Sequence, residues 1–234
     1  MSRVLDLNVI ERGFLMSEIS YRSIPLFSGL NDEQLDLLKS ITNKRRYKAG
    51  EILFFEGDKP DAFYIVVEGE IQIIKVSYDG KEKILEVMGP GDFFGEMAII
   101  DSKGRSATAR VIRDSSLLVV GNQEFLNLVR EYPFIALKII GELSRRLRQA
   151  NQDIESLAFL DVETRLKKFF RRMTGEIRDN GEAVVIDRNI THQDIARFIG
   201  TSRETVTRII NKLKDKGLLE IKREKIILKD INKW

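Results

Sequence analysis

The stretch THQDIARFIGTSRETVTRI, residues 191–209, decides the fold of the carboxy-terminal part of the chain. Thr191, with Asp194 three residues later, is typical of a helix N-cap, and the turn Gly200-Thr201-Ser202 separates this helix from a second one. The apolar positions of both helices fall on one face, at Ile195, Ala196, Ile199, Val206, Ile209, Ile210 and Leu213. The pattern predicts two packed helices joined by a short turn.

The sequence around these helices predicts a small sheet. Gly217 ends the second helix, and the β-like runs 218–221 and 225–228 pair across Lys222-Arg223-Glu224 as a hairpin. A further short strand is predicted at 183–186. Two helices joined by a glycine turn and followed by a basic hairpin make a winged helix-turn-helix, whose second helix enters the major groove of DNA.

Charge is unevenly distributed along the chain. Residues 162–234 carry 18 Lys and Arg against 11 Asp and Glu, a net charge of +7, whereas residues 1–161 carry 21 against 25, or −4. A basic carboxy-terminal third is typical of a module that binds a polyanion, and a solvated basic surface has the same composition.

Upstream, nine of the sixteen glycines fall within 72 residues, from Gly50 to Gly121. They separate short runs that are rich in β-branched and aromatic residues. These runs lie at 63–67, 71–76, 83–88 and 116–120. The spacing predicts an all-β barrel or jelly roll.

Helical patterns flank these runs. Asn31 and Gln34 predict a capping-box start for a short helix. After residue 133 the apolar residues follow a period of seven, at Ala136, Ile140, Leu143, Leu147, Ala150, Ile154 and Leu157. This seam of about three heptads predicts a long helix that pairs with a copy of itself as a parallel coiled coil. The alternative is a helix packed on its own barrel, because its start is apolar on two sides.

The composition excludes several classes of chemistry. The chain has no cysteine for disulfides, thiolate metal sites, iron–sulfur clusters or a nucleophile. Its single histidine, His192, argues against metal-dependent hydrolysis and a Ser-His-Asp triad, and residues 1–161 hold no histidine for the metal site of a cupin enzyme. We predict no catalytic or metal-ligating residue. No window approaches eighteen uncharged apolar residues, so a cytoplasmic protein is expected.

Three stretches of the chain resemble the CRP/FNR transcription regulators, and within them the catabolite activator (cyclic AMP receptor) protein type. The stretches are FFGEMAIIDSKGRSATA at 93–109, SLAFLDVETRL at 156–166 and the run at 191–209. Together with the patterns above, the resemblance predicts an α+β chain in three parts. These are a cyclic-nucleotide-binding-like β-roll or jelly roll at 16–132, a dimerisation helix at 133–161 and a winged helix-turn-helix at 162–234. Residues 1–15 lie outside the resemblance and are either an extension or the result of a misplaced translation start.

Residues 95–106 contain the groups of a candidate anion site. Gly95 permits close approach of the backbone, Glu96 can accept a hydrogen bond from a ribose hydroxyl, and Arg105 with Ser106 can hold a phosphodiester. From residue types alone, a tight turn in which Glu96 pairs with Arg105 is the simpler interpretation. The resemblance implies a grip on the ribose-phosphate of a cyclic nucleotide. The effector-binding set is Gly95, Glu96, Met97, Arg105, Ser106, Arg146, Ala150 and Asn151.

The long helix departs from the family pattern at the base contact. The family's cyclic AMP responders meet the base with a threonine-serine pair. The matching residues here are Ala150, which has no hydroxyl, and Asn151, which offers a donor and an acceptor. Cyclic AMP is still the first expectation for the effector, because Glu96, Arg105, Ser106 and Arg146 are all in place, and another cyclic nucleotide is the second.

The recognition helix matches the family more closely. The resemblance places Arg203, Glu204 and Arg208 where the catabolite activator type reads a TGTGA-like half-site. Arginine forks to guanine and glutamate accepts from cytosine N4, although Thr201-Ser202-Arg203-Glu204 also fits a capping box. The full DNA-binding set is Thr191, Arg203, Glu204, Thr207, Arg208, Lys222 and Arg223. Phosphate contacts are expected at Lys222, Arg223, Lys225 and Arg188, while His192 reaches a phosphate or lies on the surface.

These patterns predict a homodimer on a two-fold-symmetric site in double-stranded DNA. The expected dimer seam is Ile140, Leu143, Leu147, Ala150, Ile154 and Leu157. A small-molecule effector between β-roll and long helix would change this seam and reorient the recognition helices. The resemblance implies activation through RNA polymerase, with no obligatory cofactor and no membrane partner. The alternative is a regulator of the same family whose β-roll binds a non-nucleotide effector, or none, and serves as a dimer scaffold.

Overall fold

The structure, a computed structural model, describes residues 21–174, 184–187, 190–222 and 225–229 of the 234-residue chain. Contacts divide these residues into two compact units, each with its own apolar core. The first comprises the residues up to 74 together with 86–143, and the second comprises 75–85 together with the residues from 144 onward. Within the described ranges, no helix has the length and apolar character needed to span a membrane.

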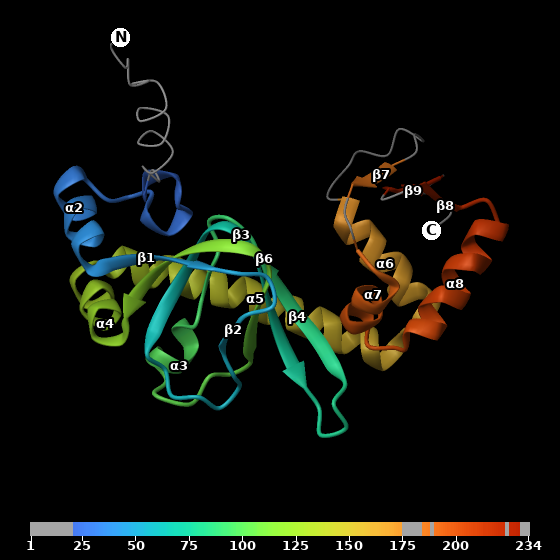
Figure 1. The fold of residues 1–234 in the computed structure, drawn as a ribbon, viewed down its shortest axis with the longest axis horizontal. Coiled ribbons are helices and arrows are strands. Elements are labelled where there is room, and N and C mark those ends of the chain that lie inside the picture. The colour runs from blue at the N-terminus through green and yellow to red at the C-terminus, as the bar shows by residue number, and fades with distance from the viewer. Residues whose placement is uncertain (1–20, 175–183, 188–189, 223–224, 230–234) are drawn as a thin grey trace, which may run out of the picture. The chain divides into compact units, whose positions relative to one another are not determined.

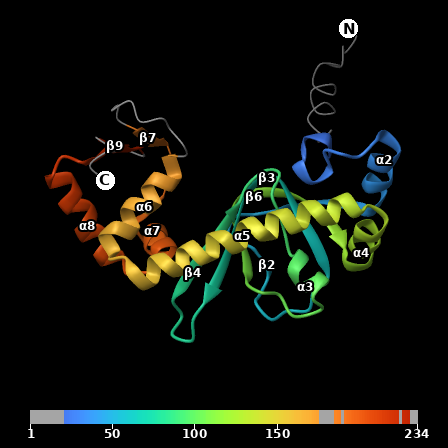
Figure 2. The ribbon, with the colours of Figure 1, turned by 180° about the vertical axis from the view of Figure 1, so that it is seen from behind.

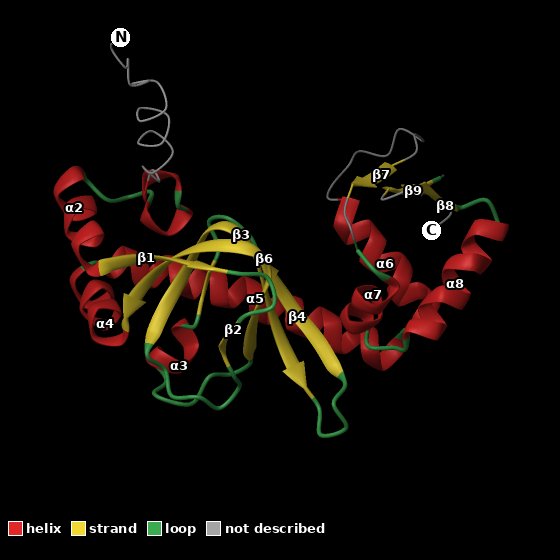
Figure 3. Cartoon of the chain, in the orientation of Figure 1, coloured by secondary structure: helices red, strands yellow, loops and turns green. Residues whose placement is uncertain are grey.

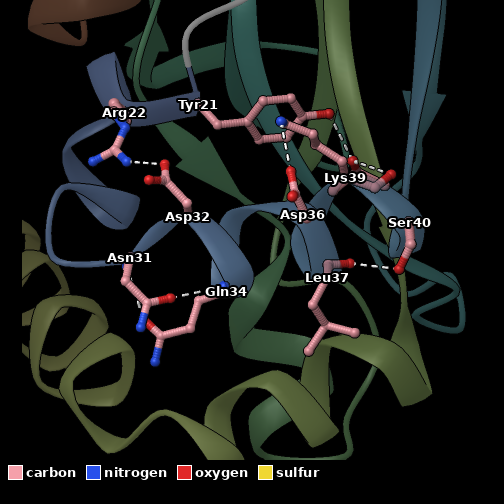
Figure 4. A network of polar contacts seen from close by, with 10 residues as sticks. Tyr21, Arg22, Asn31, Asp32, Gln34, Asp36, Leu37, Lys39 and Ser40 are labelled. Carbon is pink, nitrogen blue, oxygen red and sulfur yellow. Dashed lines mark hydrogen bonds and ion pairs between the residues drawn. The ribbon is translucent and has the colours of Figure 1, made fainter.

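Short helices with local polar contacts open the first unit (Figure 4). They are η1 (Tyr21–Ser23), η2 (Pro25–Phe27) and α2 (Asp32–Ile41). The predicted capping box of α2 is confirmed, because Asn31 Oδ1 accepts from the Gln34 amide and Gln34 Oε1 accepts from the Asn31 amide, both at 2.9 Å. Leu35 and Leu38 are buried on the predicted face and anchor α2 to the core.

The β-roll contains a six-stranded sheet among the described residues (Figures 1 and 3). Its strands are β1 (Thr42–Tyr47), β2 (Ile52–Phe54), β3 (Ala62–Val76), β4 (Glu82–Met88), β5 (Phe93–Phe94) and β6 (Thr108–Gly121). The order is β1-β6-β3-β4, with β2 paired to β6 and β5 paired to β3. Strand β6 pairs antiparallel with β1, β2 and β3. The predicted β-rich fold is confirmed.

Strand β3 differs from the prediction of two separate strands at 63–67 and 71–76. It runs through both stretches, and Gly69, with φ of 92°, lies inside it. The register with β6 shifts between Val66 and Ile71, as it does at a β-bulge. A glycine at a bulge bends a strand without ending it, and periodicity alone does not distinguish a bulge from a turn.

Three helices complete the roll. They are α3 (Glu96–Ile100), α4 (Asn122–Glu131) and the first half of α5 (Pro133–Phe159). Ile135 and Ile139 of α5 are buried in the core with Phe63 and Phe125, and Leu143 packs against the same core. Seen from behind, this half of α5 lies along the strands (Figure 2). The beginning of α5 therefore packs on its own β-roll.

The second unit is a winged helix-turn-helix, as predicted. Its elements include α6 (Val162–Thr174), β7 (Val184–Asp187), α7 (His192–Ile199), α8 (Arg203–Asp215), β8 (Leu219–Lys222) and β9 (Lys225–Leu228). The strands pair antiparallel in the order β7-β9-β8 (Figure 3). All seven apolar positions predicted for the inner faces of α7 and α8 belong to one core with Leu166 and Phe170 of α6.

Two basic side chains fix the carboxyl end of α7. Arg165 of α6 donates to the carbonyl oxygens of Ile199 at 3.0 Å and Leu160 at 2.9 Å. Lys83, which belongs to this unit, donates to the carbonyl oxygen of Phe198. Cations at a helix carboxyl end satisfy its last carbonyls and complement its dipole. The turn between the two helices is thus tied to neighbouring segments.

Substitution of Gly69 by alanine tests the bulge. A Cβ at this position would lie 2.1 Å from Ser115 Oγ and 2.5 Å from the carbonyl oxygen of Asp114. We expect Gly69→Ala to lower the unfolding free energy in urea by about 1–3 kcal/mol. Gly50→Ala is the matched control, because Gly50 has a similar φ of 95° but nothing within 4 Å. Equal losses in the two variants would contradict a role for the close contact.

Candidate functional site

Arg105 is the centre of the candidate effector site, and its side chain is only 1% exposed. Nη1 donates to the carbonyl oxygen of Gly95 at 2.9 Å. Nη2 donates to the carbonyl oxygen of Ala62 at 2.7 Å and to Asp61 Oδ1 at 2.8 Å. The guanidinium carbon lies 4.2 Å from the centre of the Phe54 ring. The cation is therefore fixed on an aromatic face, with two backbone carbonyls and one carboxylate at its edge.

The turn at Gly95 is shaped around this cation. Gly95 has φ of 87°, and a Cβ there would lie 2.6 Å from Arg105 Nη1, so only glycine fits. Glu96 follows at the start of α3 and is buried, whereas Met97 is exposed. The exposed Ser106 hydroxyl lies 3.8 Å from Met97 Sδ. The structure thus brings together, from two segments, the predicted residues around Arg105.

Asp61 and Phe54 were not among the residues predicted for the site. The pairing partner considered for Arg105 was Glu96, but the carboxylate that pairs with it is Asp61. Asp61 immediately precedes β3 and lies 44 positions from Arg105, so no local pattern connects the two residues. Phe54 ends β2, and its ring also packs against Tyr64. Both contacts arise from the pairing of distant strands.

The other three predicted effector residues lie on the carboxyl half of α5, in the second unit. Arg146 is partly buried, and Ala150 and Asn151 are exposed. Ala150 and Asn151, which stand where the family's cyclic AMP responders have a threonine-serine pair, therefore lie on an accessible face of α5. Their part in effector binding stays a prediction.

The predicted dimer seam contains three strongly exposed apolar residues. Ile140, Leu147 and Ile154 are 57%, 63% and 64% exposed, and they recur every seven residues along α5. Ala150 and Leu157 are also exposed, whereas Leu143 packs against the core of the first unit. A stripe of this size on one helix is unfavourable in water unless another surface covers it.

The exposed side of α8 forms a shallow hollow. Its lining residues are Arg203, Glu204, Thr207, Arg208 and Asn211. The first four belong to the predicted DNA-binding set. Asn211 was missed, although it lies three and four residues after Arg208 and Thr207 and therefore on the same helix face. An amide at this place adds a donor and an acceptor to the two arginines and the glutamate.

The N-cap of α8 is Ser202, whose hydroxyl accepts from the Thr205 amide at 3.2 Å. Thr201 and Glu204 therefore do not form the capping box that their spacing suggests. Glu204 nevertheless has local partners, because its own backbone amide and the Ser202 hydroxyl lower the pKa of its carboxyl. The side chain is fully ionised near neutral pH and lies at the surface.

The side chains of Thr207 and His192 contact each other. Thr207 Oγ1 donates to the Arg203 carbonyl oxygen at 2.9 Å and lies 2.9 Å from His192 Nδ1. Partial burial, and then the charges of Lys214 and Arg203, lower the pKa of His192. The imidazole is therefore mainly neutral at pH 7, and its ring supports the start of α8.

The other described residues predicted to contact DNA lie at the start of α7 and on the wing. The Thr191 hydroxyl accepts from the Asp194 amide at 3.1 Å, which confirms the predicted cap of α7. Lys222 is exposed at the end of β8 and forms an ion pair of 2.8 Å with Glu220. Lys225 is exposed at the start of β9. Arg188 and Arg223 lie outside the described residues.

Two known domain families match this chain, one in each unit. The cyclic nucleotide-binding domain matches residues 44–132, and the Crp-like helix-turn-helix domain matches residues 164–233. The cyclic AMP receptor protein of Thermus thermophilus is 34% identical over 201 residues, which cover 84% of this chain and 88% of that protein. The CRP-like cAMP-activated global transcriptional regulator of Mycobacterium tuberculosis is 27% identical over 216 residues, which cover 92% of this chain and 96% of that protein.

A solved structure agrees with these matches. The c-di-GMP-responsive global regulator CLP of Xanthomonas campestris is 27% identical, with a TM-score of 0.73 and coverage of 85% of this chain and 99% of that chain. The order of a cyclic nucleotide-binding domain and a Crp-like helix-turn-helix, together with this similarity over most of its length, shows that the chain belongs to the CRP/FNR family of transcription regulators.

Proposed function

We propose that the protein is a homodimeric regulator that binds a two-fold-symmetric DNA site under the control of a cyclic nucleotide. The observation that carries the proposal is the buried guanidinium of Arg105 in a cyclic nucleotide-binding domain. Nε of this group has no hydrogen-bond partner among the residues that the structure describes. A buried donor without an acceptor is costly, and a phosphodiester oxygen would satisfy it.

Cyclic AMP is the first candidate effector. Two relatives that cover most of the chain are named for cyclic AMP, and Gly95, Arg105 and Ser106 supply the turn, the cation and the hydroxyl for a phosphodiester. Ala150 and Asn151 favour a different base contact from a threonine-serine pair. Another cyclic nucleotide is therefore the second candidate, and the c-di-GMP-responsive CLP is a relative of that kind. The alternative is a β-roll that binds a non-nucleotide effector, or none, and serves as a dimer scaffold.

Removal of the Arg105 cation tests the effector site. We expect Arg105→Leu to abolish detectable binding of cyclic AMP and cyclic GMP in titration calorimetry, because the anion loses its charge-assisted donors. Lys103→Leu, which removes an exposed cation two residues earlier, should bind as the parent does. Binding that persists in a folded Arg105→Leu protein would refute the site. Full operator binding by a parent that binds no nucleotide would favour the scaffold.

The exposed face of α8 supports direct reading of base edges. Arg203 and Arg208 carry guanidinium forks that match guanine O6 and N7, and Glu204 can accept from cytosine N4. Lys222 on the wing is suited to phosphate contacts, which position the protein without specifying sequence. A TGTGA-like palindrome is the proposed site. Activation through contact with RNA polymerase is the regulatory outcome that we infer.

Separate variants distinguish base contacts from phosphate contacts. We expect Arg203→Ala and Arg208→Ala each to weaken binding to a TGTGA-type palindrome by about 1–3 kcal/mol and to flatten base preference at one position. Lys222→Ala, the control, should weaken all sequences alike and reduce the salt slope of binding by about one. Selection from a random DNA library measures the preference. An unchanged selected sequence for Arg203→Ala would show that Arg203 does not read a base.

The exposed stripe of α5 supports dimerisation. Ile140, Leu147 and Ile154 match one position of successive heptads, and a second copy of α5 would cover them. In the proposed mechanism, effector binding changes the packing of this stripe near Ala150, and the two recognition helices then match half-sites about 34 Å apart. Only an effector with different affinities for the two arrangements can shift their populations.

A charge on the stripe tests the dimer. We expect Leu147→Glu to give monomers in sedimentation and to lose operator binding, because two copies would bring like charges face to face. Gln152→Glu adds the same charge to an exposed position of α5 that is not on the stripe, and it should remain a dimer. A dimeric Leu147→Glu protein would assign the self-contact to another surface.

A further inference from the structure

Asp61 stands out at the effector site because its exposure differs so much from that of its partner. The Arg105 side chain is 1% exposed, whereas the Asp61 side chain is 76% exposed, and they form an ion pair of 2.8 Å. A carboxylate that remains in water can leave the cation and be rehydrated at little cost. The guanidinium cannot leave in the same way, because it is enclosed by Phe54 and two backbone carbonyls.

Asp61 shares the hold on Arg105 with two backbone acceptors. The Gly95 carbonyl accepts from Nη1, and the Ala62 carbonyl accepts from the same Nη2 that Asp61 engages. These two backbone acceptors fix the plane of the guanidinium, and the Phe54 ring supports its face. The distinctive contribution of Asp61 is therefore its negative charge.

That charge lies against the same cation that the proposed anionic ligand would bind. Arg105 has five N–H donors, and Nε is buried without an acceptor in the described part of the chain. An anion that reaches this donor shares the guanidinium with the Asp61 carboxylate. Two like charges at one cation repel each other, and each reduces the gain from binding the other.

We propose that Asp61 is an internal counter-ion that competes with the effector's phosphate for Arg105 and so lowers the affinity of the site for cyclic nucleotides. This inference rests on the proposed function of Arg105 as the phosphate ligand. Asp61 keeps the buried cation neutralised without effector and is displaced towards water when a phosphodiester binds. The residue thereby sets the effector concentration at which the regulator responds.

The test compares Asp61→Asn with the parent in titration calorimetry, using the full chain with cyclic AMP, cyclic GMP and cyclic di-GMP in turn. Asparagine keeps an oxygen acceptor for Nη2 and removes the charge. We expect roughly two- to fivefold tighter binding of the nucleotide that the parent binds, the size of an exposed charge interaction. The gain should shrink at high salt, because screening weakens exposed charges. Asp61→Ala should also bind more tightly, because the two backbone acceptors remain.

The matched control is Asp101→Asn, which removes an exposed carboxylate that accepts from the Lys103 amide and does not contact Arg105. It should bind with the parent's affinity. If the parent binds a nucleotide and both Asp61 variants bind it equally or more weakly, Asp61 is not a competitor and the inference fails while the proposed function stands. If neither the parent nor the Asp61 variants bind any of the three probes, the nucleotide site itself is refuted, and this inference with it.

Discussion

Burial of the Arg105 guanidinium constrains the segments of the β-roll that surround it. A buried cation must be paired and hydrogen-bonded, because an uncompensated charge costs several kcal/mol in a protein interior. Arg105 meets this requirement with side-chain bonds to Asp61, Ala62 and Gly95. Its backbone adds two more bonds, from its amide to the Asp58 carbonyl and to its carbonyl from the Gly57 amide. Segments 57–62, 95 and 105 are thus held together before any ligand arrives.

In the second unit, the backbone of α8 is held by a buried face while the side chains of Arg203, Glu204 and Arg208 remain exposed. The inner faces of α7 and α8 are buried in one core, and Arg165 ties down the end of α7. Ser202 caps α8, so the helix begins at Arg203, the first residue of the helix in the predicted DNA-binding set. A rigid backbone lowers the entropy that DNA binding must remove, because only the exposed side chains need to be ordered.

The features that the sequence predicted correctly are those that depend on contacts within a few residues of each other. The capping residues at Asn31 and Thr191, and the buried faces of α7 and α8, follow from hydrogen bonds and periodicity within a few residues. The bulge at Gly69 was predicted as a turn, because the close approach of Ser115 belongs to a distant strand. Asp61 and Phe54 were missed for the same reason. Arg105 was found through the resemblance of residues 93–109 to the family, but its acceptors come from the fold.

In both candidate sites, some of the predicted binding groups already have partners within the chain. Asp61 pairs with Arg105, the Ser202 hydroxyl bonds the Glu204 carboxylate, and Glu220 pairs with Lys222. In the proposed function, binding of a phosphate or a base edge would exchange one partner for another, and the net gain would be the difference between the two. When the partner that is displaced becomes exposed to water, hydration replaces most of the interaction that it loses. The net free energy of the exchange is therefore small, and it can still favour binding. A regulator needs such moderate differences, since its effector must leave when the concentration falls, and since only differential affinity moves the equilibrium between its states.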